Sequence, residues 1–158
     1  MKTWILIGVL SALLTGCSCG PAFVQGEMEE EYEVKTIGQV EDNSPVVYGA
    51  HSVYFTKVNR QKLSGIKYLR LGLSGFPNAI RLPEGEQTLY LWRDGNPDFN
   101  LFLSKIQLVN DHKYLVDYIT KPEGNFVRIF YWVEDLNDGS VVYGKRVTPT
   151  MMTNTHTQ

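Results

Sequence analysis

The residues that could do acid–base, nucleophilic or metal chemistry are few in this sequence, and they stand far apart. The three histidines are His51, His112 and His156, and none has another histidine or a cysteine within three to five positions. Zinc-type sites are built from such local pairs, so the sequence predicts no metal site. His112 falls in an expected turn, where we expect a solvated loop residue. No motif for holding a cofactor is present.

Two stretches resemble functional motifs and depart from them at a defining position. The stretch 72–76 (GLSGF) is similar to the nucleophile elbow G-x-S-x-G, but Phe76 replaces the second glycine and no strand–helix junction follows. The stretch 135–140 (DLNDGS) resembles a calcium loop, but Gly139 arrives one residue too early for its spacing. A hairpin turn accounts for the same letters. We therefore expect no catalytic residues.

Three aspartates need separate comment. Asp94 and Asp98 lie in 93–100 (RDGNPDFN), where they are either turn formers or carboxylates of a site built from strand-end loops. Asp117 lies between apolar residues of an expected strand. If its face is buried, its charge needs a partner, and Arg128 on a neighbouring strand is a candidate; an exposed face would need none.

The two cysteines, Cys17 and Cys19, both follow an apolar run near the start of the chain. The run extends from Trp4 to Leu14, with the positive charge of Lys2 before it and small residues after it. It is too short to cross a bilayer as a helix, which takes about 20 residues. Its length and order are typical of a signal-peptide h-region.

The sequence Leu14-Thr15-Gly16-Cys17 resembles the lipobox of bacterial lipoproteins, which reads aliphatic, small, Gly or Ala, then Cys. The resemblance implies a diacylglycerol on the Cys17 thiol, cleavage between Gly16 and Cys17, and often a further acyl chain, such as palmitate, on the new amino group. Stable anchoring takes two acyl chains, so the membrane would be a permanent partner. Ser18, rather than Asp, follows the lipobox and favours the outer membrane. With Cys17 alkylated, Cys19 is a small tether residue, an intermolecular thiol or a second acylation site.

We expect four segments in the chain: a signal peptide (1–16), an acidic tether (17–33), one domain (34–147) and a polar tail (148–158). Removing residues 1–16 takes away one charge, that of Lys2, so the formal net charge moves from −2 to −3. A weakly acidic domain argues against nucleic acid as a partner, because nucleic-acid binders carry basic stripes.

The pattern of the domain predicts β-strands, because short runs rich in Val, Ile, Leu, Tyr and Phe alternate with Gly, Asn, Asp and Pro. No segment after the signal peptide keeps a helical repeat. The strand spacing predicts an all-β fold, a single antiparallel β-sandwich of about 7–9 strands. The expected strands are 34–41, 46–58 with a break at Gly49-Ala50, 66–73, 78–82, 86–93, 100–109, 113–120, 126–134 and 140–147.

Side-chain alternation predicts two further features of these strands. In 100–109 the apolar phase changes between Leu103 and Ile106, which requires a bulge or bend near Ser104-Lys105. In 126–134 both faces are apolar or aromatic. That pattern indicates a strand inside a sheet, or one whose outer face meets a partner.

The order "IRLPEGEQTLYLW" followed by "KIQLVNDHKYLVDYI" is similar to that of small β-sandwich domains of bacterial envelope lipoproteins and of PEGA-type modules. The matching positions are Leu82-Pro83-Glu84-Gly85, Thr88-Leu89 and Tyr114-Leu115-Val116, within residues 46–145. Glu86-Gln87 departs from the pattern, which often has His or Tyr before the Thr-Leu pair. The resemblance implies a sandwich fold and a cell-envelope setting, and it implies no catalytic residues.

We therefore interpret the chain as a membrane-anchored cell-envelope lipoprotein, with a non-catalytic β-sandwich as a binding or structural module. An envelope protein or a glycan is the expected partner. Aromatic residues are enriched at binding surfaces, so Trp132 and Trp92 are the candidate surface residues. The alternative is a small-ligand carrier or enzyme with a site in the strand-end loops at 93–100.

Overall fold

The computed structural model describes residues 32–66 and 75–147. These residues form strands in two sheets and contain no helix, which confirms the all-β class. The signal peptide, Gly16, Cys17, nearly all of the 17–33 tether and the 148–158 tail lie outside the described residues. The expected strand at 66–73 lies outside them apart from its first residue.

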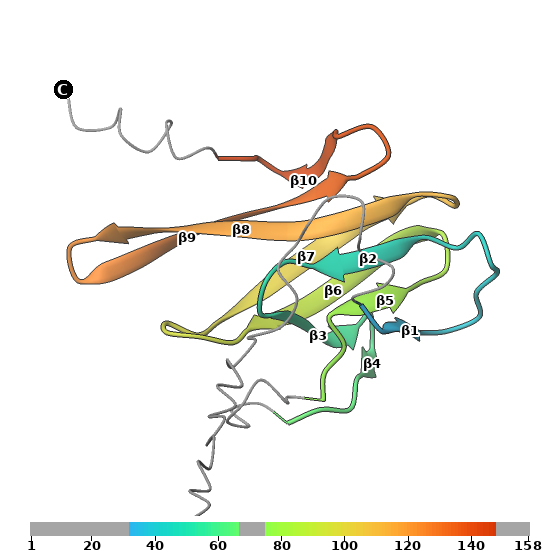
Figure 1. Cartoon of the computed structure of the whole chain (residues 1–158), viewed down its shortest axis with the longest axis horizontal. Helices are drawn as coiled ribbons and strands as arrows, with labels where there is room; N and C mark the ends of the chain where they lie inside the picture. Colours follow the sequence, from blue (N-terminus) through green and yellow to red (C-terminus); the bar gives the residue numbers. More distant parts are fainter. Residues whose placement is uncertain (1–31, 67–74, 148–158) are drawn as a thin grey trace, which may run out of the picture.

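Ten strands are present among the described residues, where 7–9 were expected for the domain. The six-stranded sheet has the order β1-β5-β2-β8-β9-β10, and the four-stranded sheet has the order β4-β3-β6-β7 (Figure 1). The strands are β1 (Val34–Thr36), β2 (Val46–Gly49), β3 (Val53–Val58), β4 (Gln61–Lys62), β5 (Ala79–Arg81), β6 (Gly85–Arg93), β7 (Phe99–Leu108), β8 (Lys113–Glu123), β9 (Phe126–Asp135) and β10 (Val141–Gly144).

The expectation of purely antiparallel pairing was wrong. β1 pairs with β5 in parallel, and β2 pairs with β8 in parallel, with Val46 opposite Lys113. The cause is that, among the described strands, the chain changes sheet four times: between β2 and β3, between β4 and β5, between β5 and β6, and between β7 and β8. Some strands of the six-stranded sheet therefore pair with strands far away in the sequence. No short turn connects such a pair, so the two strands can run parallel to each other.

The expected break at Gly49-Ala50 is confirmed, and it is one of the points where the chain changes sheet. β2 ends at Gly49, and β3 begins at Val53 after a tight turn in which the Val53 amide donates to the Ala50 carbonyl at 2.8 Å. A Cβ on Gly49 would lie 2.4 Å from the Val53 carbonyl oxygen. Only glycine fits this approach without a backbone shift.

The bulge expected near Ser104-Lys105 is also confirmed. Gln87 pairs with Ile106 and Leu89 with Leu103, so Thr88 faces the two residues Ser104 and Lys105 on β7. Lys105 has a φ of 58°, and an extra residue of this kind restores the phase of a strand. As a result, the apolar side chains before and after the bulge reach the same core.

Side chains from both sheets form one buried cluster. It includes Val47 and Val116 from the six-stranded sheet, and Phe55 and Leu91 from the four-stranded sheet. Alternate residues of the six-stranded sheet point to its other face, where a smaller cluster contains Tyr48. The two sheets thus pack against each other through these apolar side chains, and the burial of these side chains stabilises the fold.

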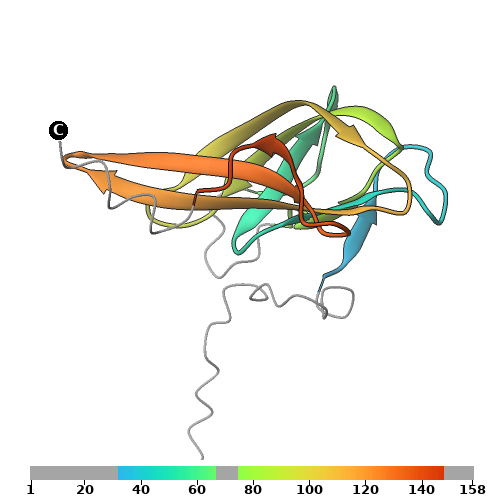
Figure 2. The ribbon, with the colours of Figure 1, turned by 90° about the horizontal axis from the view of Figure 1, so that it is seen from above.

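The long strands β8 and β9 extend past the ends of their neighbours (Figures 1 and 2). β2 accompanies β8 only as far as Val116, and β10 accompanies β9 only as far as Trp132. Within residues 117–131, from here on the β8–β9 ribbon, β8 and β9 are therefore paired with no third strand among the described residues. The two strands join through a two-residue turn at Gly124-Asn125.

Candidate functional site

The prediction that Trp92 lies on a binding surface was wrong, because its side chain is completely buried. The face was assigned correctly: Leu89 and Leu91 point into the main core, and Trp92 points to the opposite face of the four-stranded sheet. That face is covered. The Trp92 ring packs against Tyr54 at 6.0 Å and edge-on against Phe76 at 6.5 Å. Phe76 lies in the connection between β4 and β5. The alternation of side chains within a strand does not predict where such a connection lies.

Trp132 is also buried, so the second predicted surface residue was wrong too. It lies on the face of β9 that points away from the main core, between Asp117 on β8 and Gly144 on β10. Its neighbour Val133 is the residue of this segment that reaches the main core. Both faces of β9 are therefore apolar here because both are covered.

Two hydrogen bonds of the Arg93 side chain fix the conformation of the 93–100 loop. Arg93 Nε donates to the Tyr118 hydroxyl at 2.9 Å, and Arg93 Nη1 donates to the Pro97 carbonyl at 2.9 Å. The Asp94 amide donates to the Ser52 carbonyl, and Asp98 is exposed. No group of three or more His, Cys, Asp or Glu side chains in 32–66 and 75–147 is placed to hold a metal ion. The loop fixes β8 to the four-stranded sheet.

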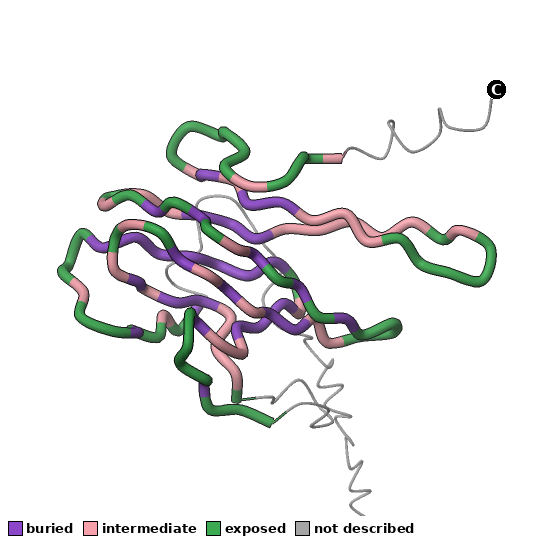
Figure 3. The backbone as a smooth tube through the Cα atoms, turned by 180° about the vertical axis from the view of Figure 1, so that it is seen from behind, coloured by how far each residue is buried: buried purple, intermediate pink, exposed green. Residues whose placement is uncertain are grey.

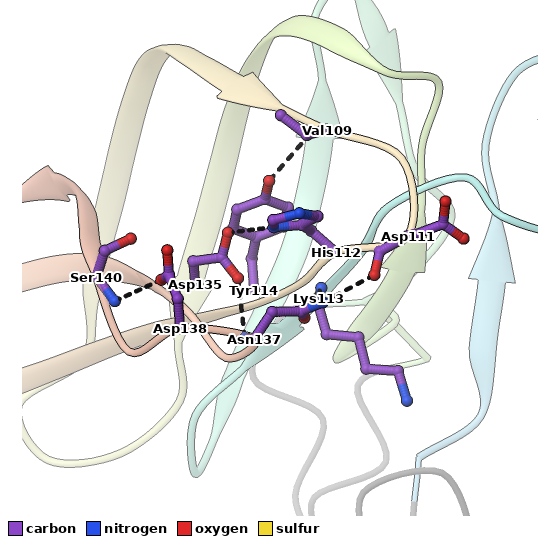
Figure 4. A network of polar contacts seen from close by, with 9 residues as sticks. All are labelled: Val109, Asp111, His112, Lys113, Tyr114, Asp135, Asn137, Asp138 and Ser140. Carbon is purple, nitrogen blue, oxygen red and sulfur yellow. Dashed lines mark hydrogen bonds and ion pairs between the residues drawn. The ribbon is translucent and has the colours of Figure 1, made fainter.

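His112 does not behave as a solvated loop residue, which corrects the expectation for it. Its Nδ1 contacts Asp135 Oδ2 at 2.5 Å, and Asp135 is buried (Figure 4). Asp135 Oδ1 accepts the amide of Asn137 at 2.9 Å. The contact joins residues 23 positions apart in the chain, which is why the spacing of the histidines did not reveal it.

The polar network around Asp135 ties two turns together (Figure 4). Asn137 Oδ1 accepts the Lys113 amide at 3.0 Å, and Asn137 Nδ2 donates to the Asp111 carbonyl at 2.9 Å. The Ser140 amide and hydroxyl bond to Asp138 and lower the pKa of its carboxyl. No Ser, Thr or Cys side chain bonds to the His112 ring within the described residues. In the described residues, the Asp–His pair instead joins the turn at 109–112 to the turn at 136–140.

Asp117 is half-buried, and Arg128 is not its partner. Arg128 pairs with Glu123 at 2.8 Å nearer the tip of the hairpin. Burial raises the pKa of the Asp117 carboxyl above its ordinary value. The hydrogen bond from the Tyr118 amide lowers that pKa in part, Glu134 raises it further, and Arg146 lowers it. The ionised carboxylate is thus disfavoured in the fold.

We expect Asp117→Asn to raise the free energy of unfolding at pH 7. Because the folded-state pKa is raised, the native protein holds this proton more tightly, and stability falls as the pH rises through the folded pKa. Asparagine removes that charge and still accepts the Tyr118 amide. Urea melts should show the gain at pH 7 and no gain at a pH below the ordinary aspartate pKa. A variant less stable than the wild type at pH 7 would contradict this assignment.

The base of the β8–β9 ribbon is fixed to the body by two tyrosines. Tyr118 packs edge-on against Phe99 at 5.3 Å and accepts Arg93, and Tyr131 donates to the Phe102 carbonyl at 3.4 Å. Beyond this base the ribbon extends past the other strands, and its tip is exposed (Figure 3). A two-stranded hairpin alone is marginally stable in water, so these tyrosines hold it in place.

The tip of the ribbon exposes apolar side chains. Phe126 is 80% exposed and Val127 is 39% exposed, and Phe126 is the most exposed large hydrophobic residue of the described part. Glu123 faces Phe126 across the strands, and Arg128 binds Glu123. An apolar tip with a paired charge beside it is typical of a contact surface with a polar rim.

Neither a family model, nor a curated protein, nor a solved structure matches this chain. In the described part of the chain, no helix is long and apolar enough to span a membrane. The β8–β9 ribbon is the candidate site. The sequence feature that pointed to this ribbon is the apolar and aromatic character of both faces of 126–134.

Proposed function

We propose that this chain is a lipid-anchored protein of the bacterial cell envelope, with acyl chains on Cys17 and the outer membrane as its favoured site. The support is the lipobox pattern behind an apolar run of h-region length. Residues 17–33 act as an acidic spacer, whose like charges keep it extended. The domain at 34–147 is a β-sandwich in this proposal, supported by two sheets that share one apolar cluster.

The domain acts as a non-catalytic binding module, and the β8–β9 ribbon is its binding surface. The single observation that carries this proposal is the projection of residues 117–131 beyond β2 and β10, with Phe126 exposed at the tip. Phe126 and Val127 are adjacent and both exposed, and contiguous exposed apolar surface is typical of an interaction site. An envelope protein is the partner that fits an apolar tip on a short tether.

Replacing the tip residues should weaken partner binding and leave the fold intact. For Phe126→Ser with Val127→Ser, we expect at least about a tenfold loss of affinity, since burying one such side chain is worth about 1.5–3 kcal/mol. Partners would be retained on the purified protein from detergent-solubilised membranes and compared between variants. Stability should change little, because both side chains are already exposed.

A matched control is available on the edge strand β10. Val141 and Val142 are 38% and 40% exposed and lie away from the tip. Val141→Ser with Val142→Ser should keep every partner that the wild type retains. Equal retention by the tip variant and the wild type would rule out the tip as the binding surface.

A further inference from the structure

One side of the β8–β9 ribbon presents backbone groups that have no strand partner. Along a strand, successive residues direct their N–H and C=O groups to alternate neighbours. The Asp135 amide donates to the Ser140 carbonyl on the β10 side at 2.8 Å. Every second residue back toward the tip, including Ile129 and Val127, therefore directs its backbone groups to that same side.

β10 ends before it reaches these residues. Its last residue, Gly144, lies opposite Trp132 and has a φ of 73°. A Cβ there would lie 2.6 Å from the Tyr131 carbonyl oxygen, so only glycine fits at the point where the strand pairing ends. Ile129 and Val127 consequently lack a strand on this side within the described residues. An edge of this kind is a template for another strand.

The chain that leaves β10 forms the second wall of an apolar groove beside this edge. The groove encloses about 440 Å³ and is lined by Ile129, Phe130, Tyr131, Lys145 and Val147. That volume lies within the range of about 300–1,000 Å³ of ligand pockets. The open edge of β9 is one wall, so an occupant with its own backbone donors and acceptors fits better than a compact apolar molecule.

Lys145 is the charged residue of the groove, and it has no carboxylate partner within the described residues. The two nearby arginines are already paired: Arg146 binds Glu134, and Arg128 binds Glu123. The groove therefore complements an occupant with a negative charge.

The opposite edge of the ribbon is less suited to pairing. The Val116 carbonyl accepts the Ala50 amide on the β2 side, so Thr120 and Pro122 direct their backbone groups to that side. Pro122 has no N–H to donate, and proline on an edge discourages strand addition. Recognition of a strand is thus favoured on the β9 side.

We propose that the β9 edge at residues 127–131 binds an extended segment of a partner protein, which adds to the sheet as a strand and places an acidic side chain against Lys145. Main-chain hydrogen bonds supply affinity in this mode, and the groove and the lysine supply specificity. The inference rests on the proposed function, because it names the class of partner for the same ribbon.

The probe is a synthetic twelve-residue peptide in which valine alternates with glutamate, added to the full-length protein. Amide hydrogen exchange measured by NMR should slow at least tenfold at Ile129 and Val127. The amides of Arg128 and Phe130 point to β8 and should not change. A purely hydrophobic contact would not produce this alternation.

Two controls test the charge. The same peptide with lysine in place of glutamate should give no protection. Lys145→Glu should lose the effect, whereas Lys62→Glu, an exposed lysine on the distant edge strand β4, should keep it. Protection by both peptides alike, or undiminished protection in Lys145→Glu, would overturn the proposal, and so would the absence of any protection at millimolar peptide.

Other occupants give different results. Protection at Ile129 that rises with protein concentration alone would mean that a second copy fills the edge, and the partner segment would be wrong. If the peptide never protects the edge while Phe126→Ser with Val127→Ser still loses a partner, the binding module stands and strand addition is rejected. If the peptide protects and the tip variant keeps its partners, the tip is not the binding surface.

Discussion

Trp92→Ala should lower the free energy of unfolding by about 3–5 kcal/mol, the range for removing a buried aromatic side chain. The indole is completely buried although it points away from the main core. Its loss leaves a cavity between the four-stranded sheet and Phe76, and neither Tyr54 nor Phe76 can move in to fill it without leaving its own packing. Urea melts of the purified protein measure the loss.

Phe126→Ala is the matched control for this substitution. It also removes an aromatic side chain from a strand, but that side chain is 80% exposed, so the loss should stay within about 0.5 kcal/mol. Should Trp92→Ala leave too little folded protein to melt, Trp92→Phe keeps part of the packing and should give an intermediate loss. Equal small losses at Trp92 and Phe126 would show that the outer face of the four-stranded sheet is open.

Cys17→Ala should abolish lipid attachment altogether. In the proposed assignment, the Cys17 thiol accepts the diacylglycerol, and cleavage after Gly16 follows that acylation. Metabolic labelling with a palmitate analogue should therefore give a labelled wild type and an unlabelled variant that keeps residues 1–16. Each acyl chain contributes about 0.8 kcal/mol per buried methylene, so no other contact replaces the anchor.

The second cysteine provides the control for the first. Cys19→Ala should keep the label and should still be cleaved, because the lipobox pattern ends at Cys17. A reduced label would instead assign part of the acylation to Cys19. Equal labelling of the wild type and Cys17→Ala would disprove the anchor.

The local features of the fold could be predicted from the sequence because each depends on neighbouring residues. The bulge at Ser104-Lys105 follows from the phase of Leu103 and Ile106, since the side-chain period of a strand is two. The break at Gly49 follows from a glycine inside an apolar run. Without the bulge, Leu103 and Ile106 could not both reach the main core, and at Gly49 a larger residue would meet the Val53 carbonyl.

The pairing of strands and the covering of faces could not be predicted, because they depend on residues far apart in the chain. Nothing near β2 indicates that β8 is its parallel neighbour. Trp92 and Trp132 were assigned to the correct faces, but their burial depends on other segments, such as the connection that carries Phe76. His112 and Asp135 meet only because two turns lie at the same end of the sheets.

The shape of the β8–β9 ribbon could be predicted only in part. The apolar and aromatic character of 126–134 indicates either an interior strand or a strand that meets a partner. The Trp132 end is interior, whereas the Phe126 end projects as the tip of the ribbon. The covered part of β9 ends where β10 ends, and β2 ends at nearly the same level on β8. These ends cannot be predicted from the sequence of β9 alone.

The proposed anchor can be measured directly as the mass of the N-terminal peptide of the protein extracted from membranes. We expect a peptide that begins at Cys17 and carries the mass of a diacylglyceryl group, with residues 1–16 absent. An unmodified Cys17 within a peptide that continues from Gly16 would contradict it.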